Sequence, residues 1–183
     1  MTLTNGLVVM TPSSIAYSGT SASINADGSV VFSACTSLSL NGVFTGNYDN
    51  YMIVTRFSND SSDVNVAIRL RSGGADETGS NYTYQVLVAG STTVVGARGT
   101  TSYMIVGNSS NDQRDGAEMA VYGPALAQPT ALRSTSVTGF TNAEIYAHAN
   151  THSLSTSYDG FTFFRASALG ALSGLITVFG FNQ

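Results

Sequence analysis

Hydrophobic and polar residues alternate most clearly in residues 64–71. Successive side chains of a β-strand point to opposite faces of its sheet. One face is therefore expected to hold the apolar residues of this stretch, which are Val64, Val66, Ile68 and Leu70. The other face is expected to hold Asn65, Ala67, Arg69 and Arg71. The pattern predicts a strand with one buried face.

The rest of the chain divides into short apolar runs that end at glycine, proline, asparagine or aspartate. The 19 glycines interrupt every long run, and the best helical window, residues 167–175, contains two of them. Further strands are expected at residues 21–24, 29–34, 37–40, 51–57, 82–88, 92–95, 102–106, 117–122, 131–138, 144–149, 160–165 and 175–181. Many short strands at such spacings are typical of sandwiches and jelly rolls. We therefore predict an all-β fold, an antiparallel two-sheet sandwich that is jelly-roll-like.

Residues 1–183 are expected to form a single β-sandwich domain with an N-terminal arm at residues 1–19. The arm contains one short apolar run, which Pro12 ends. A hairpin is predicted to follow it, with a turn at residues 25–28, because Asn and Asp favour turns and Gly28 can adopt a positive φ.

Composition narrows the classes of function. Only 10% of the residues are charged, all seven basic residues are arginine, and the net charge is −4. This balance argues against nucleic-acid binding, which needs clustered basic residues. Ser and Thr make up roughly a quarter of the chain, well above ordinary usage. Such a surface suits packing against other subunits or hydrogen bonding to sugars, and it also suits an ordinary β protein.

The sequence shows no targeting or membrane signal. Its N-terminus lacks the charged region and the long apolar core of a signal peptide. No apolar run reaches the length of a membrane span. We expect a soluble chain made in a cytoplasm, without a membrane partner.

Candidates for metal binding are few. His148 and His152 are four residues apart, but residues 144–149 are expected to be a strand followed by a turn, so the two rings should not converge. Asp112 and Asp115, like Asp60 and Asp63, lie in polar loops without the ligand spacing of a calcium loop. Loop support is the simpler interpretation of all of them, and no metal or cofactor is predicted.

Candidates for catalysis are also weak. The single cysteine, Cys35, is expected to be a small buried apolar residue rather than a nucleophile. No Gly-x-Ser-x-Gly elbow occurs, and nothing brings Glu118 and Glu144, the most strand-like acids, together. We therefore predict a protein that is not an enzyme.

Tyrosines are better candidates for a contact surface. A tyrosine joins apolar area to a polar tip, which suits interfaces and sugar stacking. The alternative is a core in which the hydroxyls are hydrogen-bonded. The residues concerned are Tyr82, Tyr84, Tyr103, Tyr122, Tyr146 and Tyr158.

Several segments resemble virion surface proteins of tailed bacteriophages, including cyanophage-type podoviruses. They are LNGVF at 40–44, YDNYMIV at 48–54, IRLRSGG at 68–74, GSNY at 79–82, STSYDGFT at 155–162 and GLITVFGF at 174–181. They mark turns and strand starts over roughly residues 38–183 and include no active residue. The resemblance implies a jelly-roll-like domain used as a capsid knob or decoration, or as a tail-fibre or host-contact domain.

The resemblance leads to three hypotheses. The first is a structural protein on the capsid surface of the virion, anchored through its arm to other virion proteins such as the major capsid protein. The second is a tail or tail-fibre domain that binds a host-surface glycan, for which a homo-oligomer is expected. The third is a depolymerase or other enzyme. A fold-level resemblance does not choose among them, because function depends on the site.

Overall fold

The computed structural model describes residues 6–60, 63–109, 114–139, 143–166 and 170–181. Within these ranges the chain forms fourteen strands and no helix, which confirms the all-β class. The strands are β1 (Val8–Val9), β2 (Ser14–Ile24), β3 (Val30–Asn41), β4 (Asn50–Asn59), β5 (Val64–Ser72), β6 (Ala75–Asp76), β7 (Tyr82–Ala89), β8 (Val94–Thr101), β9 (Met104–Ser109), β10 (Asp115–Tyr122), β11 (Thr130–Thr138), β12 (Glu144–His152), β13 (Gly160–Arg165) and β14 (Leu172–Phe181). In these same ranges no helix is long and apolar enough to cross a membrane.

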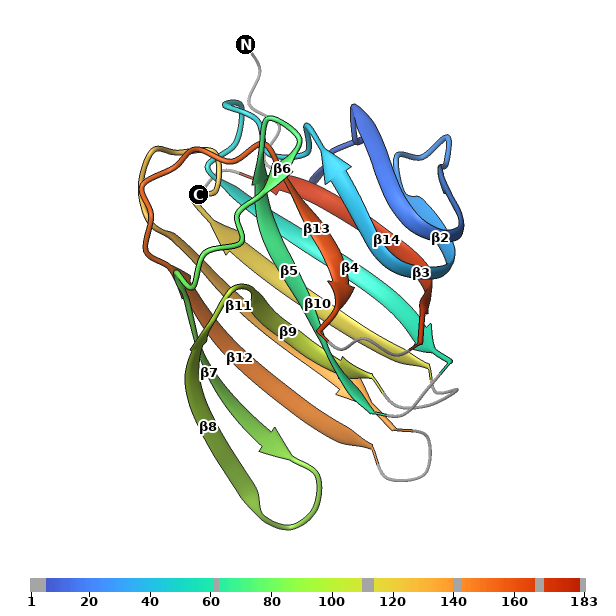
Figure 1. Ribbon diagram of the computed structural model, residues 1–183, viewed down its shortest axis with the longest axis vertical. Helices are drawn as coiled ribbons and strands as arrows, with labels where there is room; N and C mark the ends of the chain where they lie inside the picture. Colours follow the sequence, from blue (N-terminus) through green and yellow to red (C-terminus); the bar gives the residue numbers. More distant parts are fainter. Residues whose placement is uncertain (1–5, 61–62, 110–113, 140–142, 167–169, 182–183) are drawn as a thin grey trace.

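All fourteen strands belong to one antiparallel sheet that curls around its own core (Figure 1). The path runs β6-β5-β13-β3-β14-β4-β10-β11-β12-β7-β8, while β1 pairs with β14, β2 with β3 and β9 with β5. The finer expectation, a jelly-roll-like sandwich of two sheets, is not confirmed by this connectivity. The hydrogen bonds join both sides of the core into a half-barrel.

Strand β3 forms the corner of the curl. Its first part pairs with β14, whereas its residues Ser37 to Leu40 pair with β13. At the change of partner Ala34 has a positive φ of 47°, and the pairing with β2 shifts register between Ser18 and Gly19. The sequence predicted two strands, at residues 29–34 and 37–40. The structure shows one strand with a bulge, because β2 pairs along its whole length.

The proposed N-terminal arm is shorter than the sequence suggested. Residues 14–19 belong to β2, the edge strand beside β3. The apolar run before Pro12 contributes β1, which pairs with β14. The backbone N–H of Ser13 already donates to the carbonyl oxygen of Asn41 on β3, and the strand pairing continues from Ser14 through residue 19. The predicted hairpin is confirmed, with its turn between β2 and β3.

The core lies inside the curl and is rich in aromatic rings. Phe163 packs edge-on against both Phe32 and Phe57, with ring centroids 6.0 and 5.7 Å apart. The apolar residues of the alternating stretch, Val64, Val66, Ile68 and Leu70, are all buried, as predicted. On the other face of β5, Ala67 and Arg71 are buried as well.

Candidate interaction surface

An apolar groove crosses the outer face of the sheet, the face turned away from the core. It has a volume of about 440 Å³ and extends over strands β4, β10, β11 and β12. Its apolar walls include Val54, Val137 and Ile145, whose exposed fractions are 41%, 48% and 54%. Isolated exposed apolar residues are common on proteins, but a row of them along a groove is a candidate interaction site.

The register of the strands explains the groove. Val137 on β11 lies opposite Ile145 on β12 and opposite Gly116 on β10. Gly116 has no side chain to fill the space, and a Cβ added there would come no closer than 3.5 Å to any heavy atom outside its chain neighbours, namely the Thr55 carbonyl oxygen. The glycine therefore forms the floor and the aliphatic side chains form the walls.

A second depression, also of about 440 Å³, lies across strands β3, β14, β4 and β10. Arg56 and Arg114 line it together with Ser58, Ser173 and Gly174. Gly174 is required here, because a Cβ at this position would lie 2.1 Å from the carbonyl oxygen of Arg56. Two guanidinium groups and two hydroxyls thus surround a hollow above closely packed backbone.

The groove and this depression adjoin along β10. Arg114 and Asp115 line the depression, and the groove begins at the next residue, Gly116. Glu118 lines the groove further along the same strand. We call the two hollows together the outer-face surface. It has two arginines at one end and an apolar groove next to them, and Glu118 lines that groove opposite Val54.

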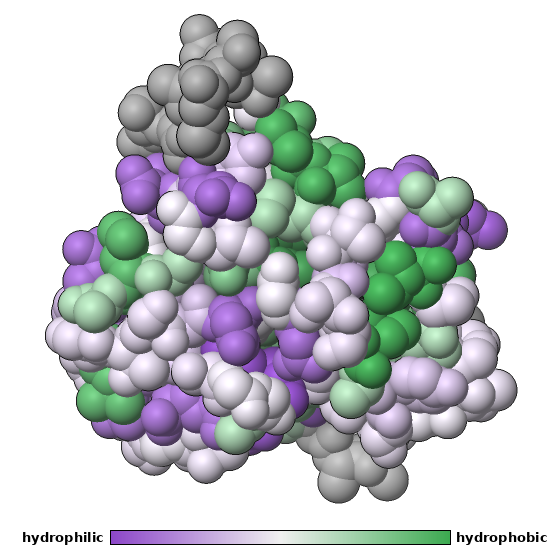
Figure 2. Space-filling view, turned by 90° about the horizontal axis from the view of Figure 1, so that it is seen from above, coloured by the Kyte–Doolittle hydropathy of each residue, from purple (hydrophilic) through white to green (hydrophobic). Residues whose placement is uncertain are grey.

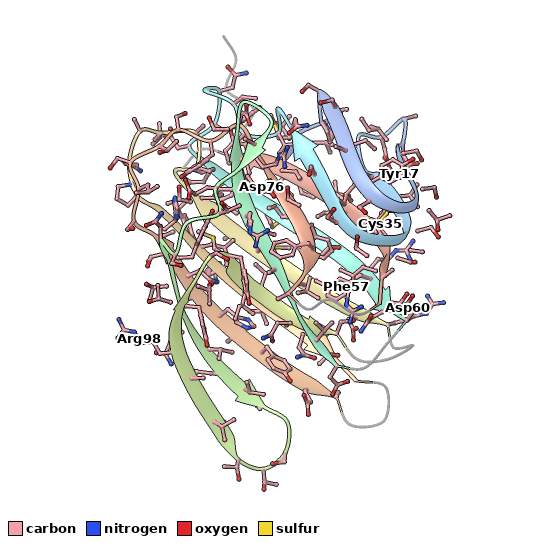
Figure 3. All side chains as sticks on the ribbon, in the orientation of Figure 1. Tyr17, Cys35, Phe57, Asp60, Asp76 and Arg98 are labelled. Atoms are coloured by element: carbon pink, nitrogen blue, oxygen red, sulfur yellow. The ribbon has the colours of Figure 1, made fainter. Side chains whose placement is uncertain are left out.

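A third, smaller depression of about 220 Å³ lies near the free edge of the sheet. It is lined by Thr83, Tyr84, Gln85, Arg98, Ala149 and Thr151. In Figure 3 Arg98 projects from β8 away from the body of the molecule. Almost every residue of β8 is exposed, because no further strand covers its outer edge.

The two histidines do not form a metal site. Strand β12 continues to His152, so the predicted turn after residue 149 is wrong. The residues lie on the same inner face, but four residues of strand separate their Cα atoms by about 13 Å. His152 shares a hydrogen bond of 2.5 Å between its Nε2 and the Tyr158 hydroxyl, and its ring centroid lies 4.2 Å from that of Tyr82. Burial lowers the pKa of His148 to about 4.

The aspartates considered as metal ligands hydrogen-bond to other parts of the fold or lie apart from one another. Asp112 lies outside the described residues. Asp115 is buried, and its two carboxylate oxygens accept hydrogen bonds of 2.6 Å from the hydroxyls of Ser109 and Thr138. Asp60 accepts one of 2.6 Å from the backbone N–H of Ala171, and Asp63 is exposed.

The two strand acids lie on opposite faces of the sheet. Glu118 lines the outer groove, whereas Glu144 accepts a hydrogen bond from the hydroxyl of Tyr146, on the inner side of β12. In the described part of the chain, no group of three or more His, Cys, Asp or Glu residues is placed to hold a metal ion.

Cys35 is buried, as the sequence predicted. Burial raises the pKa of its thiol, and its Sγ lies 3.3 Å from the carbonyl oxygen of Ser21. A raised pKa keeps the thiol protonated, which is the opposite of what a nucleophile requires.

The tyrosines divide between core and surface. Tyr82 and Tyr158 are buried, and the Tyr82 hydroxyl donates to the carbonyl oxygen of Glu77 at 3.0 Å. Tyr122 is partly exposed, and its hydroxyl accepts a hydrogen bond of 3.0 Å from Nε of Arg133. Only Tyr84 lines one of the three depressions described above. The core interpretation is therefore correct for Tyr82 and Tyr158.

Sequence reasoning missed the residues of the outer-face surface. The alternation of side chains along a strand could show that Val137 and Ile145 each share a face of their own strand with polar residues. It could not show that they meet across strands, or that Gly116 lies beside them. Figure 2, which views the molecule from the top of Figure 1, shows apolar patches separated by polar residues on the face seen from there.

The comparisons with known proteins add little to this description. No family model and no curated protein matches the sequence. A crystal structure of a protein of unknown function from Shewanella oneidensis MR-1 aligns with 98% of this chain and 80% of its own, at 8% identity and a TM-score of 0.26. A score this low supports no argument about fold or function.

Proposed function

We propose that this chain is a non-enzymatic structural protein of a tailed-phage virion that decorates the capsid by docking on another virion protein. The observation that supports the proposal best is the outer-face surface, where an apolar groove adjoins two arginines. Within the described residues neither arginine forms an ion pair, since the ion pair found there joins Arg71 and Asp76. Unpaired charge beside exposed aliphatic walls suits a docking site for protein.

Burial of the groove walls would give a partner a favourable contact. Covering a half-exposed aliphatic side chain contributes roughly 1 kcal/mol, from about 25 cal/mol per Å² of apolar surface. Val137 and Ile145 face each other on the neighbouring strands β11 and β12, and Val54 lies on β4 across β10, so one partner segment that crosses the groove could cover all three. The major capsid protein is the partner that the phage resemblance implies.

The resemblance also supports the finer description of the fold. The LNGVF motif lies at the end of β3, where Gly42 has a φ of 70° in the turn. The YDNYMIV motif leads into β4, and the hydroxyl of Tyr51 donates to the carbonyl oxygen of Thr45 at 2.6 Å. We propose that the curled sheet is a jelly-roll-like sandwich whose two sides remain joined through β3.

The second candidate function is a host-contact domain on the tail that binds a surface glycan. The depression around Tyr84 favours it, because Gln85, Arg98 and Thr151 surround an aromatic ring with hydrogen-bonding groups. The free edge of β8 provides a route to the homo-oligomer that such a domain would form.

Gold-antibody labelling of intact particles, viewed by electron microscopy, tests the proposal. We expect label over the head. Label confined to the tail would contradict capsid decoration and favour the glycan-binding alternative. Absence of label from particles would contradict both.

Two surface variants test whether the groove is the site through which the chain docks on the particle. We expect Val137→Lys and Ile145→Lys to fold normally but to load poorly onto particles that lack the wild-type chain. Asn65→Lys, an equally charged change at an exposed position of β5, is the matched control and should load normally. Normal loading of all three variants would exclude the groove as the docking site.

A further inference from the structure

We propose that the depression lined by Arg56 and Arg114 binds a carboxylate, and that this carboxylate belongs to the partner segment that fills the adjoining groove. The inference rests on the proposed docking function and names the chemistry of the docked segment. That segment is extended, with an acidic side chain followed two residues later by an aliphatic one.

The geometry of the sheet brings the two arginines to one hollow. Arg56 lies opposite Gly116, and Asp115 lies opposite Phe57, so Arg114 reaches the level of Ser58. Arg56 and Arg114 are therefore diagonal neighbours on one face. Such positions are about 7–8 Å apart, within the reach of long side chains.

Two glycines lie close to Arg56. Gly116 is opposite Arg56 on β10 and presents no side chain beside it on the outer face. Gly174 is opposite the core residue Phe57 and lets β14 pack against the carbonyl oxygen of Arg56, where a Cβ would lie 2.1 Å away. The depression lined by the two arginines has a volume of about 440 Å³.

The remaining groups at the rim complement an anion. Ser58 lies opposite Ser173, and the Ser173 hydroxyl oxygen accepts a hydrogen bond of 2.9 Å from the backbone N–H of Ala34. Ser58 and Ser173 both line the depression, so each brings a hydroxyl that can donate to an anion. Among the described residues, the acidic side chain that lines the depression is Asp115, and both of its carboxylate oxygens accept hydrogen bonds from Ser109 and Thr138.

The distance between the two hollows sets the distance between the acidic and the aliphatic side chain of the docked segment. Arg114 directly precedes β10 and Gly116 is its second residue. The two residues are two positions apart, which is about 7 Å in an extended chain. Alternate side chains of an extended peptide have the same separation and point the same way. An acid at one position and an aliphatic residue two further on would reach the arginines and the groove together.

The test uses two peptides with the 15N-labelled full chain in an NMR titration. They are acetyl-Glu-Ala-Val-amide and its uncharged counterpart, acetyl-Gln-Ala-Val-amide. We expect the Glu peptide to shift the amide signals of Gly116 and Gly174 and to bind about tenfold more tightly, as expected for loss of one charge-assisted contact. In Arg56→Gln and Arg114→Gln the two peptides should bind equally weakly.

Arg98→Gln is the matched control, because it removes the same charge from an exposed arginine outside the outer-face surface. It should leave the preference for the Glu peptide unchanged. Equal binding of both peptides to the wild-type chain would overturn the proposal. So would an equal loss in Arg98→Gln, which would show attraction to overall charge, or tighter binding of inorganic phosphate than of the Glu peptide.

Failure of this inference can be separated from failure of the proposed function. If labelled chain covers the phage head and Arg56→Gln with Arg114→Gln loads normally, the carboxylate site is wrong and docking stands. If the chain is absent from particles, the docking function fails whatever the peptides show.

Discussion

Arg71 on β5 donates a hydrogen bond of 2.8 Å from its Nη1 to the Oγ1 of Thr162 on β13. The Thr162 hydroxyl in turn donates to Oδ1 of Asp76 at 2.6 Å, and the guanidinium of Arg71 also pairs with that carboxylate. Arg71 is almost fully buried, so its charge depends on these partners. The network joins β5, β6 and β13 at one end of the sheet.

We expect Thr162→Val to destabilise the fold by about 1–3 kcal/mol, because it removes a group that both donates and accepts within a buried charged network. Urea unfolding followed by tyrosine fluorescence would measure the change. Thr100→Val, at an exposed position of β8, is the control and should change stability by less than about 0.5 kcal/mol. Equal stability of the two variants would show that the network contributes little.

A second prediction concerns the corner of the curled sheet. Gly19 has a φ of 152°, and a Cβ there would lie 2.2 Å from the carbonyl oxygen of Ala34. We expect Gly19→Ala to cost more than about 2 kcal/mol, since backbone must move at the bulge. Gly46→Ala, where an added Cβ meets nothing within 4 Å, serves as the comparison in thermal unfolding. A similar melting temperature for both would contradict this role of Gly19.

Stability should also depend on pH through His148. Its folded pKa of about 4 lies below the ordinary histidine pKa of 6.5, because burial disfavours the charged ring. Between these values the unfolded chain binds a proton that the folded chain does not, so stability falls as pH drops from about 6.5 toward 4. The full effect is about 3 kcal/mol, at 1.36 kcal/mol per pKa unit.

Urea midpoints measured at pH 4.5 and 7.5 would detect it. His148→Leu should reduce the difference between the two midpoints without removing it, because burial also lowers the pKa of His152. An unchanged difference in the variant would assign the pH dependence to other groups.

The edge strand β8 leads to a prediction about assembly. It pairs with β7 on one side only, and Val94 and Val95 are 62% and 58% exposed. Unprotected edges of this kind pair with other chains. We expect concentration-dependent self-association in sedimentation velocity experiments, weakened by Val95→Lys. A chain that stays monomeric at high concentration, with or without the lysine, would show that the edge is not an assembly site.

Much of the secondary structure could be predicted from local pattern. The buried face of β5, the β2–β3 hairpin and the burial of Cys35 follow from alternation, turn residues and side-chain chemistry. These features depend on neighbours in sequence, which is why they can be read without the fold. The prediction of two strands in place of β3 was wrong. In sequence, a bulge looks like the end of a strand unless the partner strand is known.

The sequence by itself determined that this protein is an all-β chain with an acidic, lysine-free, hydroxyl-rich surface. Only the tertiary structure decided that the strands join in one curled sheet and that Arg56, Arg114 and Gly116 share a surface with Val137 and Ile145. The reason is physical. Side-chain alternation sets the face on which each residue lies, but the register between strands distant in sequence sets which residues meet on that face.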